Sequence, residues 1–186
     1  MVETVGRVFA AVPLPHEIKL ALADRINGID IPGKVVPPEN WHITVRFLGS
    51  VDQVAYERFL AVLAEAEMPM SFSIRLTGLG AFPNPRKATV VWAGVVDSSG
   101  SLGELNEITE TAAQSAGLGP EERPFHPHVT LARVRPQKDV TQLVEQHVDL
   151  GWKADQLVLF RSHFGSGEAS YEVLERFGFS PANNHI

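Results

Sequence analysis

The chain of 186 residues contains no cysteine. This absence excludes disulfides, thiolate metal ligands and a cysteine nucleophile, and it fits a reducing cytoplasm, which is the location we expect. Every apolar run is short and interrupted, so we expect no membrane span and no membrane partner. The N-terminal stretch MVETVGRVFAAVPLP also lacks the charged start and long apolar run of a signal peptide.

The sequence also has no excess of basic residues. The formal net charge is −6, which argues against a broad electrostatic grip on a nucleic-acid backbone. If nucleic acid is a ligand, its contact should be local, at an end or at a single phosphate. The length and the hydrophobic content of 44% fit one globular domain, and the net charge and short surface elements favour a monomer.

The apolar pattern predicts the same order of elements twice. Alternating and β-branched segments indicate strands, and apolar residues at helical spacing indicate helices. The first copy is predicted to have strands over 5–12, 41–48 and 71–78 and helices over 16–26 and 54–67; the second, strands over 88–96, 125–134 and 155–164 and helices over 101–116 and 138–148.

Three landmarks test whether the copies are in register. A shift of 83 residues relates Val8 to Val91, and similar shifts of 86 and 84 relate His42 to His128 and 71 to 155. A nearly constant shift indicates a duplicated β-α-β-α-β unit, with an internal repeat of approximately 5–80 and 88–164 and a final strand over 169–178. We therefore predict an α+β fold in which one domain, 1–186, has two pseudo-symmetric lobes related by a pseudo-twofold axis.

The pattern His-x-Thr-x occurs once in each copy, as HITV at 42–45 and HVTL at 128–131. Residues i and i+2 of a strand project to the same face, so each strand presents one imidazole and one hydroxyl. A pseudo-twofold axis would place His42, Thr44, His128 and Thr130 around one small volume. Such a site is suited to chemistry that needs two matched sets of groups.

Two imidazoles that titrate near neutral pH can act as a base on one side of a substrate and as an acid on the other. Threonine hydroxyls can donate hydrogen bonds to non-bridging oxygens. The matching substrate is a phosphodiester attacked in line, and a strained cyclic phosphodiester suits the site best. Ring strain lowers the barrier, so the site could work without the metal pair of many phosphodiester enzymes.

These paired motifs, together with WHITVRFLG, GAFPNPRKATVVWAGV and FHPHVTLAR, resemble the 2H phosphoesterases, and among them the RNA 2′,3′-cyclic phosphodiesterases once called 2′-5′ RNA ligases. The resemblance covers nearly the whole chain. It implies mainly antiparallel sheets flanking a central cleft, with helices outside. It implies hydrolysis of a terminal 2′,3′-cyclic phosphate to a 2′-phosphomonoester on RNA ends or nucleotides, without a cofactor. It also implies that His42 is the proton donor and His128 the proton acceptor, which residue chemistry alone leaves open.

Three neighbours of the motifs are candidate substrate-binding residues. Arg46 follows His42 by four residues, so strand alternation predicts that it shares the histidine face. Arg133 follows His128 by five, and strict alternation turns it away unless a bulge reorients it; the resemblance implies an arginine there that holds phosphate. Phe125 is a candidate for stacking on the terminal base, or else a rim or core aromatic residue.

Other interpretations stay open at this point. His126 and His128 form a H-x-H pair with the spacing of a metal chelate, although no further ligands lie near them in sequence, and we expect no metal. The same pocket could carry out reversible 2′-5′ joining or cleave another cyclic phosphate. A catalytically silent module that binds RNA ends is a third possibility, which the presence of both motifs disfavours.

Overall fold

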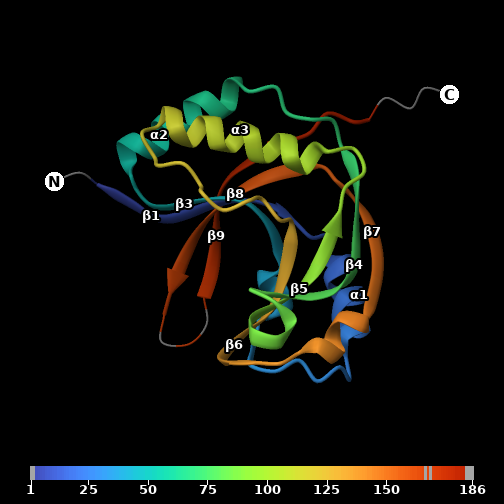
Figure 1. The fold of residues 1–186 in the computed structure, drawn as a ribbon. Coiled ribbons are helices and arrows are strands. Elements are labelled where there is room, and N and C mark those ends of the chain that lie inside the picture. The colour runs from blue at the N-terminus through green and yellow to red at the C-terminus, as the bar shows by residue number, and fades with distance from the viewer. Residues whose placement is uncertain (1–2, 166, 168, 183–186) are drawn as a thin grey trace.

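The computed structural model describes residues 3–165, 167 and 169–182, so both ends of the predicted domain lie outside the described residues. The elements follow one another in the order shown in Figure 1. The strands are β1 (Thr4–Pro13), β2 (Lys34–Val35), β3 (His42–Asp52), β4 (Phe72–Phe82), β5 (Ala88–Val96), β6 (His128–Lys138), β7 (His147–Ala154), β8 (Gln156–Phe164) and β9 (Ala169–Gly178). The α-helices are α1 (His16–Ile26), α2 (Gln53–Glu65) and α3 (Ser101–Ser115), and the short 3₁₀ turns are η1 (Pro38–Asn40), η2 (Pro85–Lys87) and η3 (Thr141–Glu145).

The strands form one curled antiparallel sheet in the order β7-β4-β5-β6-β3-β1-β8-β9, and β2 pairs with β6. Its two four-stranded halves meet where β3 pairs with β6, through a single registered pair, Ile43 and Val129. Elsewhere neighbouring strands pair over several residues. The prediction of an α+β fold with two pseudo-symmetric halves is confirmed, with the halves joined in one continuous sheet.

The third strand of each predicted copy crosses to the other half of the sheet. Strand β4 belongs to the first copy but pairs with β5 and β7, and β8 belongs to the second copy but pairs with β1. The helices cross in the same way, since α1 packs against β7 and α3 packs against β3. Each half is therefore built from both copies, which ties the two halves together.

The predicted helix over 138–148 is wrong. The segment contains only the 3₁₀ turn η3, and its end enters strand β7, whose Val148 is buried. β7 pairs with β4 and so covers a strand edge that would otherwise be left open. Tertiary pairing thus outweighs the helical spacing in a segment rich in β-branched valine. The second copy consequently has one α-helix where the first has two.

The core lies between the sheet and the helices. Its largest fully buried side chains come from both sides of this interface, including Phe59 and Leu63 of α2, Leu102 and Leu105 of α3, and Leu131 of β6. Figure 1 shows α2 and α3 side by side over one part of the sheet and α1 apart from them. No helix in the described part of the chain is long and apolar enough to cross a membrane.

One close approach in the sheet depends on a glycine. Gly80 lies opposite Trp92 on the neighbouring strand, and a Cβ atom at Gly80 would lie 2.1 Å from the indole ring. The equivalent cross-strand pair in the other half is Phe9 and Phe160, whose rings stack 5.3 Å apart. A large ring therefore occupies in one half the space that two smaller rings share in the other.

We expect Gly80→Ala to destabilise the fold by about 1–3 kcal/mol, because the added methyl forces Trp92 to move. Gly103→Ala is the matched control: this residue is exposed in α3 with nothing within 4 Å of the added atom. The control should be neutral or stabilise by up to about 1 kcal/mol, the usual gain of alanine over glycine in a helix. Urea unfolding measures both, and equal effects would contradict the close approach.

Candidate active site

The pair formed by Ile43 and Val129 positions the two motifs. Both side chains are fully buried, so the motif residues on either side of them project to the opposite face of the sheet. Thr44 and His128 line a cavity there, and this face is called the cleft face below. In an antiparallel ladder with this register, His42 lies beside Thr130 and Thr44 lies beside His128. The fold thus places two imidazoles and two hydroxyls on one face, in crossed order.

Each motif histidine is held through the same ring nitrogen. Nδ1 of His42 lies 2.7 Å from the backbone oxygen of Asn40, and Nδ1 of His128 lies 2.7 Å from that of His126. A carbonyl can only accept, so Nδ1 carries the hydrogen in both rings and a neutral imidazole has its lone pair on Nε2. Nε2 of His42 lies 3.0 Å from the Thr44 hydroxyl. Both rings are thereby set to exchange protons through Nε2.

Aromatic side chains surround both imidazoles. The ring of His42 lies 4.8 Å from Phe9 and 5.3 Å, edge-on, from Tyr171. The ring of His128 lies 5.0 Å, edge-on, from Phe82. Burial among these rings penalises the charged form and lowers the pKa of both histidines, that of His42 to about 4. Nearby basic groups lower both pKa values further: Lys19, His128 and Arg133 for His42, and His126 and Arg133 for His128.

In the free protein we therefore expect His42 to stay neutral at pH 7 and to take up its proton only near pH 4. A bound anion between the rings should oppose the effects of burial and raise this pKa. NMR titration of the histidine ring signals, with and without inorganic phosphate, measures both values. A midpoint near 6.5 for His42 in the free protein would contradict the buried geometry.

A β-bulge follows each motif at the same position. In β3 the register against β1 shifts between Thr44 and Arg46, and in β6 the register against β5 shifts between Thr130 and Ala132. The extra residue reverses the alternation, so the residue five positions after each histidine is exposed beyond the motif. In β6 this residue is Arg133, as the resemblance implies, and in β3 it is Phe47.

The alternation that was predicted to put Arg46 on the histidine face is interrupted, because the bulge lies between Thr44 and Arg46. Arg46 is nevertheless among the residues that line a cavity beside His128. Only 6% of Arg46 is exposed. Its guanidinium pairs with Glu110 of α3 and donates to the backbone oxygens of Phe47 and, at 2.6 Å, Gly119. These partners engage all three guanidinium nitrogens and hold α3 and the loop after it against β3, which gives Arg46 a structural role.

The two arginines should therefore respond differently to substitution. We expect Arg46→Met to destabilise the protein by about 3–5 kcal/mol, because it leaves Glu110 without its partner. Arg133→Met should change the free energy of unfolding by less than about 0.5 kcal/mol, since this residue is exposed. Urea unfolding of both variants measures the difference, and a stable Arg46 variant would contradict the assignment.

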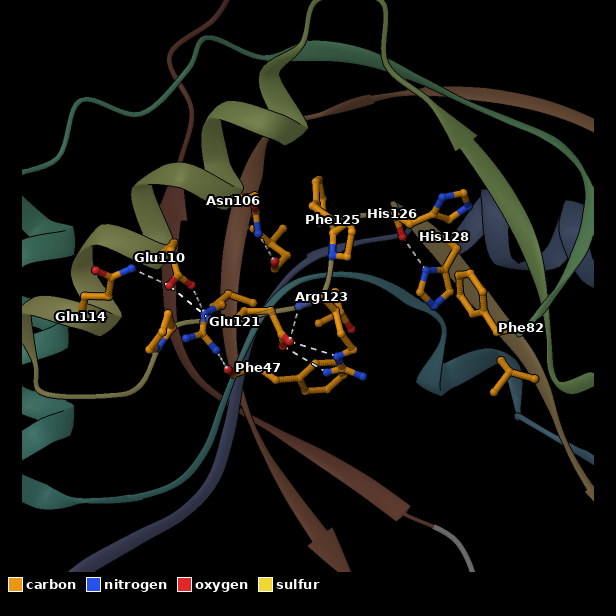
Figure 2. Close-up of a pocket in the computed structure, with 16 residues that line it drawn as sticks. Phe47, Phe82, Asn106, Glu110, Gln114, Glu121, Arg123, Phe125, His126 and His128 are labelled. Atoms are coloured by element: carbon orange, nitrogen blue, oxygen red, sulfur yellow. Dashed lines mark hydrogen bonds and ion pairs between the residues drawn. The ribbon is translucent and has the colours of Figure 1, made fainter. Parts of the chain in front are cut away.

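A cavity of about 630 Å³ opens beside His128 (Figure 2). Thr44, Phe47, Phe82 and His126 line it near the motifs, and α3 and the following loop close its other side with Asn106, Glu110, Gln114, Glu121, Arg123 and Phe125. Phe125, the candidate for stacking on a base, is thus among the residues that line this cavity. Phe47, with 49% of its surface exposed, was not predicted as a site residue from the sequence. It lies 86 residues before Arg133, the same shift that relates His42 to His128, so the repeat could have indicated it.

His126, the other histidine of the H-x-H pair, lines this cavity. Its ring packs 5.1 Å from Trp92 and 5.3 Å from Phe82. Among residues 3–165, 167 and 169–182, no group of three or more histidine, aspartate, glutamate or cysteine residues is arranged to hold a metal ion. The H-x-H spacing therefore has no third protein ligand within the described chain.

Comparisons with known proteins agree with this geometry. A family model described as LigT like Phosphoesterase matches residues 12–92 and 96–169. Curated relatives named RNA 2′,3′-cyclic phosphodiesterase include one from Aeropyrum pernix, 39% identical over 70% of this chain and 73% of the relative, and one from Thermus thermophilus, 34% identical over 92% and 89%. A structure of Escherichia coli LigT complexed with 3′-AMP superposes with a TM-score of 0.78 at 26% identity, covering 95% of this chain and 99% of the other.

Proposed function

Since this chain belongs to the family of LigT-like phosphoesterases, we propose that it hydrolyses a terminal 2′,3′-cyclic phosphate on RNA to a 2′-phosphomonoester by metal-independent catalysis with two histidines. The observation that carries the proposal is the pairing of β3 with β6, in which Ile43 lies opposite Val129, the second residue of each motif. The resemblance that the motifs predicted is confirmed by the family match.

The reaction class has the broadest support. The chain is a hydrolase that acts on a cyclic phosphodiester, as predicted, because its curated relatives carry that activity in their names over most of this sequence. The RNA end as substrate and the roles of single residues go beyond this class and form the proposal proper.

The proposed roles follow from the hydrogen bonds of the two imidazoles. Neutral His128, with its lone pair on Nε2, accepts a proton from water as the water oxygen attacks phosphorus. Protonated His42 donates its Nε2 proton to the leaving 3′ oxygen as the bond from phosphorus to that oxygen breaks. The Nδ1 bonds to backbone carbonyls hold both rings in place, and the bound phosphodiester anion raises the pKa of His42 toward the value that an acid needs.

The remaining groups bind the substrate. Thr44 and Thr130 donate hydrogen bonds to the non-bridging oxygens, and Arg133, exposed after the bulge in β6, pairs with the phosphate charge. The cavity beside His128 takes the terminal base, with Phe47 and Phe125 as stacking platforms. Equivalent bulges thus expose a cation, Arg133, in one half of the site and an aromatic ring, Phe47, in the other.

The test is product analysis on a short RNA that bears a 2′,3′-cyclic phosphate, in the presence of EDTA. We expect a 2′-phosphate end from the wild-type protein, and a fall in kcat of at least about 100-fold in both His42→Ala and His128→Ala, the usual contribution of a general acid or base. His147→Ala, an exposed histidine on another strand, is the matched control and should retain full activity.

Each other outcome contradicts a stated part of the proposal. Loss of activity in only one histidine variant would overturn the two-histidine mechanism. Loss of wild-type activity with EDTA, and its return with a divalent cation, would overturn metal independence. A 3′-phosphate product would reverse the assignment of the leaving oxygen.

A further inference from the structure

The cleft face of the sheet continues past His42 onto β1, β8 and β9. Phe9 of β1 pairs with Phe160 of β8, which pairs with Val173 of β9, so these side chains share one face. The Phe9 ring lies against His42. This extended face is therefore the same surface that presents the acid of the proposed reaction.

Farther out, this face carries exposed aromatic and basic groups. Arg7 pairs with Ser162, and Ser162 with Tyr171, in the next row. Phe164 follows on β8 with 67% of its surface exposed, and the Arg7 guanidinium lies 5.1 Å from the centre of its ring. The neighbouring acidic residue, Glu172, alternates to the other face, where it pairs with Arg161.

The same face is fixed relative to the catalytic motif. The side-chain amide of Asn40 donates to the backbone oxygen of Ala169 at 2.7 Å, at the start of β9. The backbone oxygen of this same Asn40 holds Nδ1 of His42. Asn40 therefore links strand β9 to the imidazole of His42. A ligand bound on β8 and β9 consequently keeps a defined position relative to the reacting phosphate.

We infer that this face, with Phe164, Arg7 and Tyr171 as its main contacts, binds the single-stranded RNA that precedes the cyclic end. The inference rests on the proposed function. Aromatic platforms beside a cation bind successive unpaired bases and the linking phosphate without the broad positive charge that this chain lacks. Phe160 of β8 lies near the ring of His42. Phe164 is four residues farther along the strand, which is about 13 Å at about 3.3 Å per residue. A single nucleotide bound at His42 does not reach Phe164.

The test compares a 2′,3′-cyclic mononucleotide with a short single-stranded RNA that ends in the same nucleotide. We expect Phe164→Ala to raise KM for the RNA about tenfold and to leave KM and kcat for the mononucleotide unchanged. Phe164→Tyr, which keeps the ring, should restore the wild-type KM. Leu20→Ala is the control, because Leu20 of α1 is similarly exposed, at 59%. It should leave KM and kcat unchanged for both substrates.

Direct binding separates this inference from the proposed function. Fluorescence anisotropy with single-stranded RNA ending in a 2′-phosphate requires no turnover, and Phe164→Ala should weaken that affinity about tenfold. Arg7→Gln should make the slope of the logarithm of the binding constant against the logarithm of the salt concentration shallower by about 0.7, the value for one lost phosphate contact on single-stranded RNA. Equal RNA affinity of the wild type and Phe164→Ala would overturn the inference. If Phe164→Ala also changed the mass measured by sedimentation, the exposed ring would instead be a contact between two copies of the chain.

Discussion

One backbone pairing determines the site: Ile43 of β3 opposite Val129 of β6. This pair joins the two halves of the sheet. A slip of one strand by one residue would turn the motif on that strand from the cleft into the core. Because both side chains are fully buried, such a slip would also expose one of these two core residues and bury one imidazole. The hydrophobic pattern therefore protects the register on which the catalytic geometry depends.

Duplication gives each half of the site one histidine and one threonine, and small departures from symmetry make the two halves chemically different. Both imidazoles donate Nδ1–H to the backbone oxygen two residues earlier, but that residue is Asn40 in one half and His126 in the other. Asn40 also anchors β9, whereas the His126 ring lines the cavity. Five residues after each histidine, one half presents Phe47 and the other Arg133. These unequal halves match the proposed substrate, a phosphodiester with a base on one side and a phosphate charge at its centre.

Much of this could be predicted from the sequence, because motif and spacing are local signals. The repeat predicted the paired strands, and alternation placed each histidine with its threonine. The crossing of β4 and β8 could not be predicted, since a constant shift shows which strands are equivalent and not which ones pair. The interrupted alternation at Arg46 could not be predicted because a bulge is a property of two strands together, and the segment 138–148 was misread because the open edge of β4 lies far away in sequence.

The central claim is that one protonated and one neutral imidazole act together on a single phosphodiester. The pH dependence of kcat on a 2′,3′-cyclic nucleotide tests it most directly. Two-histidine catalysis predicts a bell-shaped profile, in which the rate falls at low pH as His128 becomes protonated and at high pH as bound His42 loses its proton. A rate with only one limb across the range in which imidazoles titrate would contradict it.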